Sequence, residues 1–129
     1  MNIIISNTSN LAIYEQIVEQ IKDAVIRQEL KPDEPLPSIR SLARDLQISV
    51  ITTSRAYEVL EAEGILYAQP GKGFYVKPFK KELLKEKRLQ LLEGQMLELI
   101  RQCKSADLSE EDMITMIKLL YETKEEDLR

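Results

Sequence analysis

The strongest constraint on the fold lies in residues 38–76, where two helical patterns only a few residues apart are followed by two β-prone runs. Ser38 and Ser49 are suitable N-cap residues for the two helices, and Gly64 is a natural residue to end the second one. The β-prone runs flank a Pro/Gly turn at residues 69–73. The pattern predicts a helix-turn-helix followed by a β-hairpin.

A further amphipathic helix is predicted upstream, over residues 11–28, with Asn10 as its N-cap. Its apolar residues recur at spacings of three and four: Leu11, Tyr14, Ile17, Val18, Ile21, Ala24 and Val25. The next segment, residues 31–37, contains three prolines, which remove backbone donors and disfavour helix, so we expect an extended connector. Three helices and a hairpin in this order are typical of a winged helix, and the predicted fold class is therefore α+β.

Composition excludes several kinds of active site. The 129 residues contain no His, so Ser-His, Cys-His and His-metal arrangements cannot occur, and we expect neither an enzyme nor a bound metal or cofactor. The single cysteine, Cys103, cannot form an internal disulfide. A secretory signal and an apolar run of about 18 residues are both missing. These features predict a cytoplasmic protein without a membrane segment.

The composition changes after Pro78 to a Lys/Glu/Leu-rich helical stretch, so we expect one domain over residues 1–78 and a helical region over residues 79–129. The expected seam of a short coiled coil consists of Leu89, Leu92, Met96, Leu99 and Cys103, with Ile100 widening the apolar face. Cys103 is expected to be a small buried apolar residue. A single helix cannot bury this surface, so we predict a dimerisation tail, the alternative being a lipid or drug pocket.

The tail should end in a second helix. Asp107 and Ser109 precede an acidic first turn, which the helix dipole favours, and apolar residues follow at helical spacing. Residues 125–129 are expected to fray.

The run from Leu36 to Val76 resembles the DNA-binding domain of the GntR family of bacterial transcriptional regulators. The resemblance is carried by Leu36-Pro37-Ser38, Arg40, Leu60-Glu61-Ala62-Glu63-Gly64 and Gly71-Lys72-Gly73, and it extends back through the first helix to residue 11. Arg55-Ala56-Tyr57 is similar to the YtrA subfamily, whose members have short two-helix tails. Larger GntR subgroups often carry Arg where Val50 and Ser54 stand here. The tail is too short for their C-terminal effector domain.

The resemblance implies a homodimeric regulator that binds an inverted-repeat operator on double-stranded DNA. It further implies repression of an operon that contains the regulator's own gene and often an ABC transporter. In a recognition helix, Arg55 can reach guanine or phosphate, and Val50 and Ile51 can contact thymine methyl groups. The residues expected to contact DNA are Ser38, Arg40, Ser49, Val50, Ile51, Thr52, Arg55, Gly71, Lys72 and Gly73.

Alternatives remain for several of these residues. The net charge is −4, and residues 38–76 carry four basic and four acidic side chains, so charge alone does not decide for DNA. Val50 and Ile51 could belong to the core, Arg40 could pair with Asp45 on the surface, and Lys72 could sit on a plain solvated hairpin. The competing function is a winged-helix protein-interaction module without DNA binding. The sequence does not identify an effector.

Overall fold

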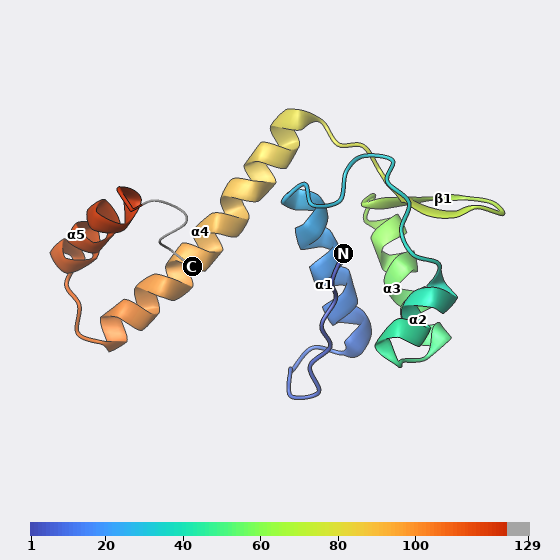
Figure 1. Ribbon diagram of the computed structural model, residues 1–129, viewed down its shortest axis with the longest axis horizontal. Helices are drawn as coiled ribbons and strands as arrows, with labels where there is room; N and C mark the ends of the chain where they lie inside the picture. The colour runs from blue at the N-terminus through green and yellow to red at the C-terminus, as the bar shows by residue number, and fades with distance from the viewer. Residues whose placement is uncertain (124–129) are drawn as a thin grey trace. The chain divides into compact units, whose positions relative to one another are not determined.

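The computed structural model describes residues 1–123. Its contacts divide the chain into two compact units, Met1–Arg88 and Leu89–Arg129, which are treated separately below. In chain order, the elements are α1 (Ile13–Ile26), α2 (Ile39–Leu46), α3 (Val50–Ala62), β1 (Leu66–Gln69), β2 (Gly73–Val76), α4 (Lys81–Ser105) and α5 (Glu110–Tyr121) (Figure 1). The fraying expected for residues 125–129 lies outside the described residues.

Helix α3 lies at the centre of the first unit and packs against both α1 and α2. Four side chains of α3 are completely buried, at 0% exposure: Thr53, Ala56, Tyr57 and Leu60. They recur at helical spacing and therefore form one face, which packs against apolar residues of α1 such as Ile17 and Ile21. The predicted order of three helices and a hairpin is confirmed.

The predicted bounds of α1 are wrong at both ends. Asn10 does not cap the helix, which begins at Ile13 after an extended Ala12. The side chain of Gln16 donates a hydrogen bond to the Leu11 carbonyl at 3.0 Å, and Leu11 stays exposed outside the helix. The helix ends at Ile26 because the chain turns at Gln28, whose φ of 63° lies in the left-handed region.

The predicted hairpin is confirmed, with Leu66 opposite Val76 and Gln69 opposite Gly73 in antiparallel register. The predicted extended connector is confirmed only for residues 34–37, which run beside β2, because residues 31–34 form a turn in which Asp33 has a φ of 64°. The Leu36 amide donates to the Phe74 carbonyl at 2.9 Å, and the Asp33 amide donates to that of Val76 at 2.8 Å. The connector thus satisfies backbone groups on the free edge of β2 and fixes the hairpin to the helical core.

Tyr57 joins α3 to both of these segments. Its hydroxyl donates a 2.8 Å hydrogen bond to the Pro37 carbonyl, and its ring meets Phe74 edge-on, with 5.1 Å between the ring centroids. Burial raises the pKa of the Tyr57 hydroxyl well above its ordinary value. The phenol is therefore a neutral donor that fixes the start of α2 relative to α3.

The second unit comprises most of α4 together with α5. Helix α4 continues through Gly94 without a break. Helix α5 starts with a capping box in which the Ser109 amide donates to the Asp112 carboxylate at 2.9 Å, and this bond lowers the pKa of Asp112. None of the residues of α5 is buried. Across residues 1–123, the helices are all too short or too polar to cross a membrane.

Candidate nucleic-acid interface

The turn between α2 and α3 is only three residues long, 47–49. Gln47 adopts a left-handed conformation with φ 56°, and the Ile48 amide donates to the Ala43 carbonyl at 3.0 Å, which closes the end of α2. Ser49 then caps α3, its hydroxyl oxygen accepting from the Thr52 amide at 3.0 Å. The predicted helix-turn-helix is therefore present, and the beginning of α3 is sharply defined.

The first turn of α3 presents apolar side chains to solvent. Ile51 is 81% exposed and Val50 45% exposed, so neither side chain is part of the core. The Ser49 hydroxyl donates to the Thr52 hydroxyl at 2.7 Å, which links the two polar residues of this turn. An exposed β-branched pair at a helix start has no packing role within the first unit and suits contact with an outside surface.

Ser38 and Arg40 mark the start of α2. The Ser38 hydroxyl oxygen accepts from the Ser41 amide at 3.1 Å, so this side chain serves as an N-cap. Arg40 is exposed, and within residues 1–123 it has no ion-pair partner. The Asp45 carboxylate instead lies near Arg44, with 3.9 Å between Asp45 Oδ1 and Arg44 Nε. The surface ion pair considered for Arg40 does not form, and its side chain is exposed in the first turn of α2.

Arg55 is held against α1 by Tyr14. The guanidinium carbon lies 4.0 Å from the centroid of the Tyr14 ring, and one guanidinium nitrogen donates to the Tyr14 hydroxyl at 3.4 Å. This cation–π contact restricts the long side chain while leaving it exposed. Sequence reasoning missed it, because a contact across 41 residues has no local signal, although Tyr14 lies on the predicted apolar stripe.

The tip of the hairpin carries Lys72 between two glycines. Gly71 and Gly73 have φ of 77° and 112°, a region that L side chains rarely adopt, and the Lys72 amide donates to the Gln69 carbonyl at 2.9 Å. Lys72 is exposed. The hairpin therefore presents one positive charge at its end on a tight backbone that can approach a ligand closely.

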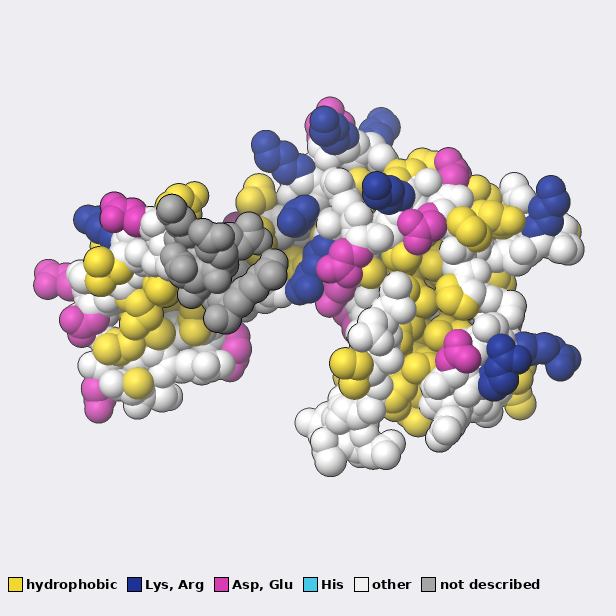
Figure 2. All heavy atoms as spheres, in the orientation of Figure 1, with side chains coloured by type: hydrophobic (Ala, Val, Ile, Leu, Met, Phe, Trp, Pro, Cys, Tyr) yellow, Lys and Arg dark blue, Asp and Glu magenta, His cyan; other side chains and the backbone are white. Residues whose placement is uncertain are grey.

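Basic side chains lie near the proposed contact surface of the first unit, while the acidic residues of α3 lie toward its other end. Figure 2 shows Lys and Arg side chains at the outer end of the hairpin and around α2. Three acidic residues of α3, in contrast, lie in its C-terminal half or at its C-cap: Glu58, Glu61 and Glu63. The ammonium of Lys22 in α1 donates a hydrogen bond to the Glu63 carboxylate, with 2.8 Å between Nζ and Oε2, and this bond raises the pKa of Lys22. The acidic residues of α3 itself thus lie away from its start, which favours an anionic partner at that end.

The apolar residues of the predicted seam are exposed within the second unit. Leu89, Leu92, Met96 and Leu99 range from 49% to 59% exposed, while Ile100 and Cys103 are half-buried. The expectation that Cys103 is buried is therefore met only in part. Helices α4 and α5 border an open, mostly apolar cavity of about 270 Å³, lined by residues that include Met96, Ile100, Cys103, Met113 and Ile117.

Among residues 1–123, no group of three or more His, Cys, Asp or Glu side chains is placed to hold a metal ion. The geometry of the first unit instead provides a protruding helix start and a positively charged hairpin tip, which together can contact an extended polyanion.

Comparison with known proteins identifies this arrangement. Residues 13–76 match the family model described as bacterial regulatory proteins of the gntR family. The chain is 37% identical over 92 residues to the HTH-type transcriptional repressor YtrA of Bacillus subtilis (strain 168), covering 71% of each protein.

Solved structures agree in fold. YtrA from Sulfolobus acidocaldarius, a GntR-family transcription factor, is similar with a TM-score of 0.57 at 28% identity, covering 92% of this chain and 96% of that one. The DNA-binding domain of AraR in complex with operator ORE1 gives a TM-score of 0.50 at 25% identity, covering 59% of this chain and 93% of that one. These relatives are regulators and not enzymes. By its sequence and its winged helix, the chain belongs to the GntR family of bacterial transcriptional regulators.

Proposed function

We propose that the protein is a cytoplasmic homodimeric repressor that reads an inverted-repeat operator with the first turns of α3. The observation that carries the proposal is the exposed start of α3, where Ile51 stands 81% exposed on a helix whose opposite face is fully buried. The likeness to an operator-bound winged helix supports DNA as the partner. A helix start placed in the major groove also presents free backbone amides to phosphate.

Each exposed residue then has a distinct task on DNA. Val50 and Ile51 contact thymine methyl groups, the one apolar feature of the major groove. Arg40 and Arg55 bind guanine edges or phosphate, and the Tyr14 ring restricts the directions in which Arg55 can reach. Ser38 and Ser49 cap their helices, and Thr52 is bonded to Ser49, so these hydroxyls fix the register of the helix starts that face the DNA.

Dimerisation through the second unit supplies the symmetry that an inverted repeat requires. Leu89, Leu92, Met96 and Leu99 are too many exposed apolar side chains for a monomer in water. A second copy of the same seam would cover them, because a two-fold interface matches one apolar stripe against itself. Burial of each leucine or methionine contributes roughly 1.5–3 kcal/mol.

The regulated genes are proposed from the relatives alone. Likeness to the YtrA repressor of Bacillus subtilis supports repression. Control of the protein's own operon, and of an ABC transporter within it, follows from the resemblance to the YtrA subfamily.

The exposed Ile51 also suits a second function, a protein-interaction module that uses this side chain as an anchor. The two functions differ in their response to salt. DNA binding weakens steeply as salt rises, because cations are released from the phosphates, whereas an apolar protein contact changes little.

A footprint of the full-length protein on the DNA upstream of its own gene tests the proposed function. We expect one protected inverted repeat, with half-site centres about 10 base pairs or a multiple apart. Protection should fade as salt rises from about 50 to 200 mM. An absence of protection at micromolar protein and low salt would favour the interaction module.

Replacing Lys72 by Ala should weaken binding to all DNA sequences alike and lower the slope of log affinity against log salt by about one. The reason is that Lys72 at the hairpin tip would bind a phosphate, which releases one counterion from the DNA but makes no contact with a base. Fluorescence anisotropy at several salt concentrations measures the slope, and Lys31→Ala in the α1–α2 connector is the matched control. If the slope is the same as in the unsubstituted protein, the hairpin does not touch the backbone.

A further inference from the structure

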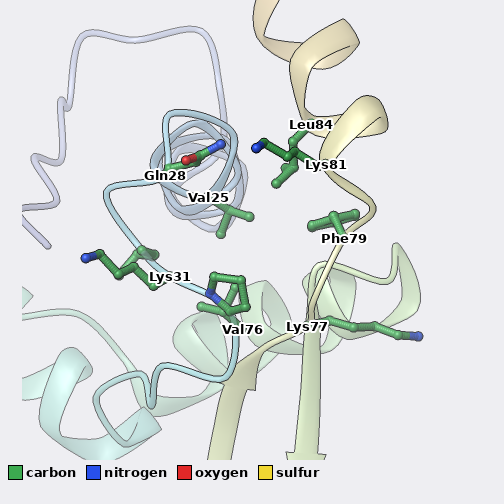
Figure 3. A pocket seen from close by; sticks show the side chains of 10 residues that line it. Val25, Gln28, Lys31, Val76, Lys77, Phe79, Lys81 and Leu84 are labelled. Carbon is green, nitrogen blue, oxygen red and sulfur yellow. The ribbon is translucent and has the colours of Figure 1, made fainter.

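A second cavity, of about 320 Å³, lies entirely within the first unit and away from the proposed DNA surface. It is bordered by the C-terminal end of α1, the connector that follows it, the end of β2 and the first turn of α4 (Figure 3). Its volume is at the lower end of the range for small-molecule sites, about 300–1,000 Å³. The cavity is thus large enough for a compact organic molecule.

The lining of this cavity combines apolar side chains with three lysines and one glutamine. Six of its residues are apolar: Val25, Leu30, Pro32, Val76, Phe79 and Leu84. The polar ones are Gln28, Lys31, Lys77 and Lys81, and none of the described residues that line the cavity carries a carboxylate. An apolar wall with one inward-pointing lysine and one amide beside it is complementary to a molecule that has an apolar body and an anionic head.

Two of the polar side chains are placed to hold such a head. Gln28 and Lys81 face one another across the cavity, while Lys31 and Lys77 point outward (Figure 3). Within residues 1–123, the side chains of Gln28 and Lys81 have neither a hydrogen-bond partner nor an ion-pair partner. Gln28 also has a φ of 63°, a conformation in which glycine is common. A long amide side chain is therefore present where the backbone alone would favour glycine.

We propose that this cavity is an effector site for a small amphipathic anion, a carboxylate or phosphate monoester with a compact apolar body. Lys81 and Gln28 bind the head, while Val25, Val76 and Leu84 contact the body. The ligand would touch the base of the hairpin and the first turn of α4 together, so it would change the support of the hairpin and thereby operator affinity. This regulatory step rests on the proposed function.

Binding is tested on the ¹⁵N-labelled full-length protein, titrated with hexanoate, benzoate and phenyl phosphate, and with hexanamide and benzamide as neutral counterparts. We expect saturable shifts of the backbone amides of Val76, Phe79 and Leu84 with at least one anion, and hexanamide and benzamide should bind at least tenfold more weakly than that anion. Lys81→Gln should weaken anion binding at least tenfold, whereas Lys85→Gln, one turn along α4, should change it less than twofold. The absence of saturable shifts with all three anions, or equal effects of the two substitutions, would overturn the site.

A second variant separates ligand binding from folding. Gln28→Gly removes the polar side chain and places at this left-handed position a residue that adopts its φ without steric cost. The substitution should therefore weaken anion binding without lowering the melting temperature. Unchanged binding in this variant would remove Gln28 from the site.

The effector role is tested by operator affinity with and without the bound anion. We expect at least a fivefold change in the unsubstituted protein and none in Lys81→Gln. An unchanged affinity at saturating anion would overturn the regulatory role. Failure of the proposed function looks different, because the protein would then bind no operator at all while the amide shifts persisted.

Discussion

Replacing Leu92 and Leu99 together by Glu should convert the protein from a dimer to a monomer and lower its operator affinity at least a hundredfold. Both side chains stand about half exposed on the seam of α4. Covering them with a second copy would place four new carboxylates in an apolar interface, and an uncompensated buried charge costs several kcal/mol. In a dimer, binding of one subunit to its half-site holds the second subunit at a high effective concentration near the other half-site. A monomer loses this advantage.

Light scattering measures the mass, and anisotropy on the intact inverted repeat measures the affinity. The matched control is Gln90→Glu with Gln102→Glu, which adds the same two charges per chain to α4 but off the seam. This control should remain dimeric and keep its affinity within a few fold. If the Leu92 and Leu99 variant stays dimeric, or if the unsubstituted protein is a monomer at micromolar concentration, the seam is not the dimer interface. The cavity between α4 and α5, which Met96 and Leu99 line, would then be the better explanation of those two residues.

Arg40→Ala and Arg55→Ala should each weaken operator binding by about 1–3 kcal/mol and leave the protein folded. Arg40 is exposed, so its loss breaks no ion pair or side-chain hydrogen bond within residues 1–123. Arg55 loses its stacking on Tyr14, which is worth about 0.5–1 kcal/mol at an exposed site. Its effect on unfolding should therefore be small beside its effect on DNA affinity.

Affinity for the operator and for a scrambled duplex distinguishes the two contacts that an arginine can make. A guanine contact lowers affinity for the operator alone, whereas a phosphate contact lowers both. Arg27→Ala, which removes the same charge from the C-cap of α1, is the control and should be nearly neutral. Unchanged operator affinity in either variant would remove that arginine from the interface.

Local signals in the sequence were enough for the helix-turn-helix and the hairpin. Ser38 and Ser49 cap their helices as predicted. Each serine precedes a run of apolar residues at helical spacing, and its hydroxyl accepts a hydrogen bond from the free backbone amide three residues later. The hairpin is similarly local, since Gly71 and Gly73 take backbone angles that other residues disfavour. The start of α1 was mispredicted because Asn10 is a good cap by type, yet nothing local indicated that Gln16 would bind the Leu11 carbonyl outside the helix.

Contacts between distant segments required the tertiary structure. Gln16 and Gln20 each exchange two hydrogen bonds with the backbone of the N-terminal segment, at Ser6 and Ile4, and hold it against α1. The local sequence around a glutamine does not show whether its side chain binds a distant backbone segment or only water. The stacking of Arg55 on Tyr14 is likewise invisible in the sequence.

The sequence by itself determined the class of the protein: a winged helix with an apolar helical tail, no histidine, and the motifs of the GntR family. Periodicity, capping and turn chemistry act over a few residues, so they can be read along the chain. Only the tertiary structure decided which side chains of those helices are exposed and which contact distant segments. It placed Ile51 in solvent and Arg55 against Tyr14, and it assembled Gln28, Val76 and Lys81 around one cavity. These positions depend on packing among segments up to about fifty residues apart, for which a single sequence carries no local signal.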